Sequence, residues 1–227
     1  MIKNNIFELR ERVLQAAKRA GLDPAGIVIV AVTKTRSAEE IREVIDSGIT
    51  DIGENRVQEA IVKYQQLLTP NSQLPTLKWH LVGHLQTNKA KDAVKIFDLI
   101  HSVDSFRLAE EIDKQAQKIN RIQDILVEVK TSEEASKSGV LPSAAPDLIR
   151  EISLLKNIRL LGLMTIAPLV DDPEKARPYF RKLRELRDQL QTPNSQLRTL
   201  SMGMSDDFEA AIEEGANMVR IGRALFD

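Results

Sequence analysis

The stretch that decides the fold is IVIVAVTK, at residues 27–34. Its apolar residues, most of them β-branched, predict a strand buried on both faces, as in a parallel sheet covered by helices. The stretch ends on Lys34, and parallel α/β folds bind their ligands at the carboxyl ends of such strands. Partial desolvation there would favour a neutral amine that can hold a carbonyl compound as a Schiff base. The alternative for Lys34 is a side chain that marks the strand end and points into water.

The alternation of short apolar strands with amphipathic helices continues along the chain. A helix at residues 4–20 precedes the first strand, Ser37 with Glu40 caps the next helix, and Ser205 is predicted to cap the last one. The eight predicted strands lie at residues 27–32, 50–53, 77–82, 99–101, 125–129, 158–164, 199–202 and 217–221. The other predicted helices lie at residues 55–68, 86–97, 105–119, 142–155 and 173–190.

Eight such strands without a long linker predict an α/β fold, a single (β/α)8 barrel of the TIM type over residues 1–227, with an extra N-terminal helix. An open doubly wound sheet is the competing fold. That fold usually has fewer strands, and no G-x-G-x-x-G follows the first strand here.

Composition excludes several classes of function. Charged residues make up 29% of the chain and the formal net charge is −1, so no basic excess indicates a nucleic-acid partner. The absence of cysteine excludes disulfides, thiolate metal sites and a cysteine nucleophile. No apolar run approaches about 18 residues, and the N-terminus has no signal-peptide core. We therefore expect a soluble, cytoplasmic protein without a membrane partner.

Small residues follow the last two predicted strands, with Ser201 and Gly203 after the seventh and Gly222 and Arg223 after the eighth. Barrel folds often hold a phosphate at this place on backbone N–H groups, so these residues predict phosphate binding. The alternative is that the glycines only close tight turns.

Arg220 lies inside the eighth predicted strand, where an unpaired guanidinium would be costly to bury. Its partner is either an internal carboxylate, such as Glu54 or Glu128, or a ligand acceptor such as a ring nitrogen. His80 and His84 are separated by a glycine and the end of a strand, so their spacing does not place them on one helical face. We therefore expect no metal site.

Motifs distributed over nearly the whole chain resemble one family. They are AVTK at residues 31–34, IGEN at 52–55, WHLVGHLQTNK at 79–89, HSVD at 101–104, SKSG at 136–139, GLM at 162–164, LSMGMSDD at 200–207 and VRIG at 219–222. On these motifs the sequence is similar to the YggS/PROSC family, the pyridoxal phosphate homeostasis proteins.

This resemblance implies a barrel similar to the N-terminal domain of bacterial alanine racemase, with pyridoxal 5′-phosphate (PLP) bound as an internal aldimine on Lys34. Arg220 would face the pyridine nitrogen. The other implied cofactor-binding residues are Asn55 and Met164 along the ring, and Ser201, Met202, Gly203, Gly222 and the backbone at Arg223 around the phosphate. Many relatives have threonine in place of Arg223, so a guanidinium or backbone contact would replace a hydroxyl here.

Three residues are secondary candidates by the same resemblance: His80, His84 and Lys137. Lys137 matches a family lysine and could receive the cofactor by transimination. The alternative is an exposed loop lysine.

The resemblance also implies a role in intracellular vitamin B6 and amino-acid homeostasis without established catalysis. An arginine at the pyridine nitrogen disfavours its protonation and makes the ring a poorer electron sink. Alanine racemase takes its second base, a tyrosine, from a second domain, whereas Tyr64 and Tyr179 here fall in predicted helices. We therefore predict a PLP carrier rather than an enzyme, with a weak amino-acid racemase and a regulatory interaction module as alternatives. The expected partners are PLP and PLP-dependent apo-enzymes, and the mixed surface charge favours a monomer.

Overall fold

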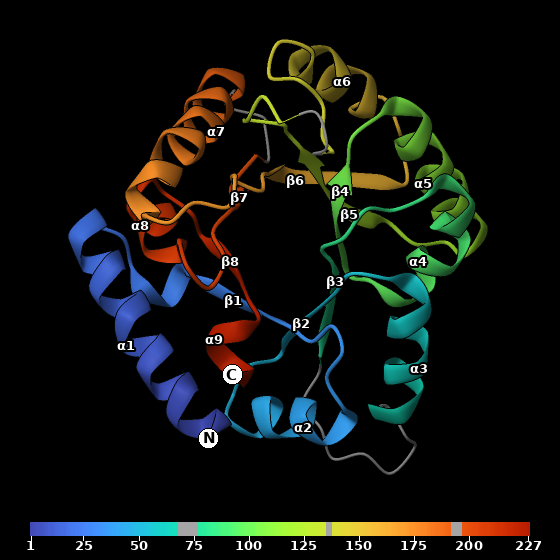
Figure 1. Cartoon of the computed structure of the whole chain (residues 1–227). Helices are drawn as coiled ribbons and strands as arrows, with labels where there is room; N and C mark the ends of the chain where they lie inside the picture. The colour runs from blue at the N-terminus through green and yellow to red at the C-terminus, as the bar shows by residue number, and fades with distance from the viewer. Residues whose placement is uncertain (68–76, 135–137, 192–196) are drawn as a thin grey trace.

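The computed structural model describes residues 1–67, 77–134, 138–191 and 197–227, which contain a closed barrel of parallel strands (Figure 1). Neighbours in sequence pair from β1 to β8, and β8 pairs with β1 to close the barrel. The predicted (β/α)8 barrel is confirmed. The strands are β1 (Val28–Val32), β2 (Asp51–Glu54), β3 (Lys78–Leu81), β4 (Leu99–Val103), β5 (Gln123–Glu128), β6 (Ile158–Met164), β7 (Thr199–Ser201) and β8 (Met218–Ile221).

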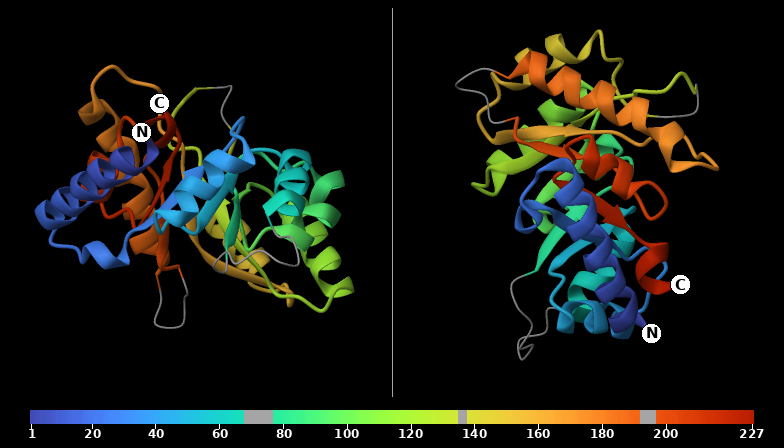
Figure 2. Two further views of the ribbon diagram at one scale, coloured as in Figure 1. Left: turned by 90° about the horizontal axis from the view of Figure 1, so that it is seen from below. Right: turned by 90° about the vertical axis from the view of Figure 1, so that its left-hand side faces the viewer.

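Helices surround this barrel, and the predicted N-terminal helix is present (Figure 1). They are α1 (Ile2–Ala20), α2 (Ala38–Asp46), α3 (Val57–Leu67), α4 (Ala90–Ile96), α5 (Phe106–Lys118), α6 (Ala145–Ile152), α7 (Arg177–Leu190), α8 (Phe208–Glu213) and α9 (Arg223–Phe226), with 3₁₀ turns η1 (Pro24–Gly26), η2 (Thr87–Lys89) and η3 (Pro173–Ala176). Because α1 packs against α8 and α9, the two ends of the chain lie close together (Figures 1 and 2). Within the described ranges, no helix is both long and apolar enough to cross a membrane.

The barrel wall separates two apolar cores, because successive side chains of a strand point to opposite faces. Between the sheet and the helices, Trp79, Phe97 and Phe180 are buried. The second core is a smaller buried cluster of Val30, Val82, Leu99, Leu126, Met164 and Met218. An eight-stranded barrel of this kind is filled by side chains, so a ligand has room only at its ends.

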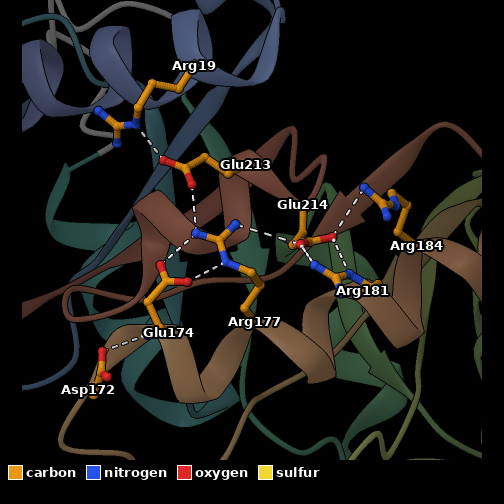
Figure 3. Close-up of polar contacts among 8 residues, drawn as sticks. All are labelled: Arg19, Asp172, Glu174, Arg177, Arg181, Arg184, Glu213 and Glu214. Carbon is orange, nitrogen blue, oxygen red and sulfur yellow. Dashed lines mark hydrogen bonds and ion pairs between the residues drawn. The ribbon is translucent and has the colours of Figure 1, made fainter.

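Ion pairs tie α7 to α8 on the outside of the barrel (Figure 3). Glu214, only 4% exposed, lies 2.8 Å from Arg181, 3.2 Å from Arg184 and 3.7 Å from Arg177. Arg177 also pairs with Glu213 at 2.7 Å. The cluster holds the first half of α7 against the C-terminal end of α8, and η3 separates this part of α7 from the loop at residues 166–171.

One predicted helix cap is confirmed and another is wrong. Ser37 Oγ accepts a hydrogen bond from Glu40 N at 3.3 Å, and Glu40 Oε2 accepts one from Ser37 N at 2.8 Å, which is the predicted capping box. Ser205 does not cap α8, because the chain forms a turn first and the helix begins at Phe208. Ser205 Oγ instead accepts from the Ala224 N–H of α9 at 3.2 Å. Since α9 has four residues, it is too short to show a helical period in the sequence.

Candidate functional site

A cavity of about 660 Å³ opens at the carboxyl ends of the strands. Five residues predicted to bind a cofactor lie on its wall: Lys34, Asn55, Arg220, Gly222 and Arg223. They come from the ends of β1, β2 and β8, so the closed barrel brings together segments that are far apart in the sequence. Val82 and Ile166 add apolar surface to the same wall. The volume of the cavity falls within the usual range of small-molecule sites, about 300–1,000 Å³.

Lys34 lines the cavity but is exposed, which corrects the expected partial desolvation of its amine. The physical reason is a turn directly after β1. The Arg36 N–H donates to Thr33 O at 3.0 Å, and Thr35 has a positive φ of 64°. Thr33 is therefore the buried residue at this strand end, and Lys34 lies at the edge of the cavity. Burial is not what would make this amine reactive.

A buried ion pair holds the backbone just before Lys34. Lys63 Nζ donates to Glu54 Oε1 at 2.6 Å and to Thr33 O at 2.5 Å, while Thr33 Oγ1 donates to the same carboxylate oxygen at 2.5 Å. Glu54 is fully buried and Lys63 nearly so. Through these bonds α3 fixes the turn that carries Lys34, a role for Lys63 that the sequence did not predict.

Arg220 lies in β8 at the base of the cavity, with 4% of its surface exposed. Its guanidinium donates from Nη1 to Ser201 Oγ and from Nη2 to Thr165 O, both at 2.8 Å. Burial lowers the pKa of Arg220 to about 10, although the negative charges of Asp207 and Glu128 act in the opposite direction. Arg220 is therefore charged near neutral pH, and these two bonds leave N–H groups of its five for a ligand.

Four other predicted residues do not reach the cavity wall. Met164, Ser201, Met202 and Gly203 are buried around the base of the site. Gly203 has φ +91°, and a Cβ there would lie 2.6 Å from the Ala211 Cβ, so its role is to allow a tight turn against α8. The residues that follow this turn, 204–207, line the cavity in their place.

A smaller cavity of about 230 Å³ adjoins the first, sharing Val82 and Ile166 with it. Glu128 and His84 line it. Burial raises the pKa of Glu128 to about 7; Asp104 adds to the effect and Arg220 opposes it. His84 is about half exposed and lies 3.9 Å from Asp104. His84 therefore borders the site, as one of the secondary candidates.

The remaining secondary candidates are elsewhere. His80 is buried and hydrogen-bonded between Asp51 and His101, away from the cavity wall. Lys137 lies outside the described residues. In the part of the chain that the structure describes, no group of three or more histidine, aspartate or glutamate side chains could hold a metal ion.

Known proteins resemble this chain over its full length. A family model described as alanine racemase, N-terminal domain, matches residues 5–227. The pyridoxal phosphate homeostasis protein of Aquifex aeolicus is 48% identical over 95% of this chain and 93% of its own length. That of Pseudomonas aeruginosa is 42% identical over 99% of this chain and 94% of its own length. The chain belongs to the pyridoxal phosphate homeostasis protein family.

Solved structures give the same result for the fold. PipY of Synechococcus elongatus, 38% identical over the whole of both chains, has a TM-score of 0.88 without PLP and 0.85 with PLP bound. An alanine racemase of Clostridium difficile is 20% identical, with a TM-score of 0.70, over 96% of this chain and 56% of the racemase. At that identity the racemase shares the fold alone.

In this member of the pyridoxal phosphate homeostasis protein family, some residues that line the cavity were not predicted from the sequence. Ser205, Asp206 and Asp207 line the cavity, as does the loop at residues 166–171 before η3. The first three belong to the family motif at residues 200–207, which was the available signal. The loop carries no motif, and it is brought to the cavity only by the folding of β6 and α7 around the barrel.

Proposed function

We propose that this chain binds PLP in the cavity at the barrel mouth, as a Schiff base on Lys34, and serves in intracellular vitamin B6 and amino-acid homeostasis. The relatives at 48% and 42% identity are named pyridoxal phosphate homeostasis proteins, and PipY has been solved with PLP bound. The observation that carries the proposal is that Lys34, Arg220 and Arg223 lie on the wall of one cavity.

The chemistry of this wall fits the cofactor. PLP supplies an aldehyde when bound, and Lys34 provides a primary amine at the edge of the cavity. Arg223 pairs through Nη2 with Asp206 and keeps its other N–H groups for an anionic phosphate group, and Ser205, whose Oγ accepts from Ala224 N, offers its hydroxyl proton. Val82 and Ile166 offer apolar surface to a flat ring. An amine, a phosphate site and an apolar wall in one cavity are what this cofactor requires.

Arg220 is proposed to face the pyridine nitrogen. A guanidinium can only donate, and this one is held at Nη1 and Nη2 by Ser201 and Thr165. A donor at that place keeps the ring nitrogen unprotonated, which weakens the electron withdrawal that carbanion chemistry needs. A racemase can tolerate this weaker electron withdrawal, so the choice between a PLP carrier and a racemase depends on the second base that racemisation needs.

A weak amino-acid racemase is the second candidate, favoured by the fold shared with alanine racemase. Racemisation needs a base on each face of the substrate. The two tyrosines of the chain are not placed for that role: Tyr64 in α3 packs on Trp79 with ring centroids 5.5 Å apart, Tyr179 lies in α7, and neither lines the cavity. The carrier function therefore remains the proposal.

We also propose that residues 1–227 act as one domain, in the cytoplasm and as a monomer, and that PLP-dependent apo-enzymes receive the cofactor. The family match over residues 5–227 supports a single domain. The absence of cysteine is consistent with the reducing environment of the cytoplasm.

Borohydride trapping tests the site. Wild-type protein incubated with PLP should gain the visible absorbance of a Schiff base, and after reduction, peptide mass spectrometry should find the label on Lys34. Lys34→Ala should lose both signals, whereas Lys182→Ala, a change at an exposed lysine of α7, should keep them. A wild-type protein that stays colourless with PLP contradicts the proposal. Interconversion of L- and D-amino acids that is lost in Lys34→Ala would favour the racemase instead.

A further inference from the structure

A continuous row of polar side chains leads from the N-terminal end of β2 to Arg220. Asp51 Oδ1 lies 3.0 Å from His80 Nε2, and His80 Nδ1 lies 3.0 Å from His101 Nε2. His101 Nδ1 is 3.0 Å from Ser201 Oγ, which is 2.8 Å from Arg220 Nη1. We call these five residues the barrel chain.

The barrel chain exists only because the barrel is closed. Its members come from β2, β3, β4, β7 and β8, and the link between His101 and Ser201 joins residues 100 positions apart. All except Asp51 are buried, and the middle three do not line the cavity. Polar groups in such a place are costly unless each finds a partner, and here each nitrogen and hydroxyl named above has one.

The chemistry of the two ends sets the direction of these hydrogen bonds. Arg220 can only donate, so Ser201 Oγ accepts from it. At the other end the Asp51 carboxylate can only accept, so His80 carries a proton on Nε2, and a His80 ring with that one proton presents a bare Nδ1 to His101.

His101, as a neutral ring, connects His80 to Ser201 by one donated and one accepted hydrogen bond. Burial, with His80 and Arg220 nearby, holds the pKa of His101 well below its ordinary value. Its Nε2–H donates to His80, and its bare Nδ1 accepts from the Ser201 hydroxyl. The reverse arrangement would turn a bare His80 Nε2 towards the Asp51 carboxylate, two acceptors 3.0 Å apart. With neutral rings, each bond therefore runs one way, from Arg220 to Asp51.

We propose that Asp51, His80, His101 and Ser201 are positioning residues that hold the Arg220 guanidinium by a one-way chain of hydrogen bonds. The bond from Nη2 to Thr165 O supplies a second anchor, so the plane of the guanidinium is fixed. Its remaining N–H groups are then directed at the ligand without a further loss of side-chain entropy on binding. The inference rests on the proposed PLP site, and it assigns to Asp51, at the opposite end of the barrel, an influence on that site.

Nitrogen NMR of histidine tests the direction of the bonds in cofactor-free protein. The chain has three histidines, and the half-exposed His84 serves as the reference signal. A one-way chain requires His80 and His101 each to carry a proton on Nε2 and to leave Nδ1 bare. Asp51→Leu removes the carboxylate that accepts from His80 Nε2, so the tautomers should shift at His101, which residue 51 does not contact through a hydrogen bond. A proton on Nδ1 of His101 in the wild type, or no shift in the variant, overturns the inference.

The dissociation constant of PLP tests the link to the site. Ser201→Ala and His101→Gln should each raise it about tenfold, the effect of losing one hydrogen bond. Gln123→Met is the matched control, because Gln123 is buried at the start of β5 but is outside the barrel chain, and this variant should bind as the wild type does. If Ser201→Ala or His101→Gln fails to fold, Asp51→Leu, at the partly exposed end, should still raise the constant.

The outcomes separate the two proposals. Folded variants with unchanged affinity refute the positioning role while PLP binding stands. A wild-type protein that does not bind PLP refutes the proposed function, and the NMR tautomers then still decide the direction of the barrel chain.

Discussion

Replacing Glu128 by glutamine should stabilise the protein at and above neutral pH and leave its stability unchanged in acid. Glu128 ends β5 and is 5% exposed; burial raises its pKa from 4.5 to about 7, with Asp104 adding to the effect and Arg220 opposing it. Because the folded state disfavours the carboxylate, the contribution of Glu128 to the unfolding free energy falls as the pH rises from 4.5 to about 7 and is constant outside that interval.

The size of the effect follows from the two pKa values. The interval from 4.5 to about 7 corresponds to about 3 kcal/mol, at roughly 1.4 kcal/mol for each pH unit. Glutamine has nearly the same shape and no charge, so Glu128→Gln removes this loss. The difference in stability between variant and wild type should be near zero at and below pH 4.5, and should reach about 3 kcal/mol above pH 7.

Urea unfolding at a series of pH values measures this difference, with the slope of the transition checked to be the same in both proteins. Glu151→Gln is the matched control, since Glu151 is exposed on α6, and it should show no such pH dependence relative to the wild type. A difference for Glu128→Gln that stays constant over the whole pH series would refute the reasoning. So would a variant that is less stable than the wild type at pH 8.

Three further substitutions test the packing around the site by chemical denaturation. Lys63→Met leaves the buried Glu54 carboxylate without its ion pair and should cost about 3–5 kcal/mol, and a loss below 1 kcal/mol would contradict a buried pair. Gly162→Ala places a Cβ 1.9 Å from Thr199 O, so β6 and β7 must separate, at a cost of about 3 kcal/mol; wild-type stability would show that the strands are not so close. Glu214→Gln weakens the bonds from three arginines of α7 and should cost about 2 kcal/mol, an effect that high salt should reduce; an unchanged unfolding midpoint would refute it.

Local patterns were sufficient to predict the fold. The run at residues 27–32 is apolar throughout because both faces of its strand are buried, and that signal is contained within six consecutive residues. The cap at Ser37 is equally local, since it joins residues three positions apart. Ser205 does not follow this local pattern. It is also a serine before a predicted helix, but its Oγ accepts a hydrogen bond from the Ala224 N–H of α9 and does not cap α8.

Part of the site could be predicted in the same way. Arg220 within an apolar strand indicates a buried guanidinium, and its 4% exposure agrees with that interpretation. The partners of Arg220 were not predicted. The sequence suggested Glu54 or Glu128, whereas Ser201 Oγ and Thr165 O accept the hydrogen bonds of the guanidinium. Ser201 ends β7 and Thr165 directly follows β6, and nothing within either segment indicates which side chains meet inside the barrel.

The sequence by itself determined which segments become the strands of the barrel and the helices α1 to α8, though not α9, because the apolar pattern of a strand or of a longer helix lies within one segment of the chain. Only the tertiary structure decided that Lys34 is exposed at the edge of the cavity, that Lys63 lies behind it, and that His101 meets Ser201. Those contacts depend on how the barrel closes and where the chain turns at each strand end. A hydrogen bond between residues 100 positions apart leaves no pattern along the chain until the strands that carry them lie across the same barrel.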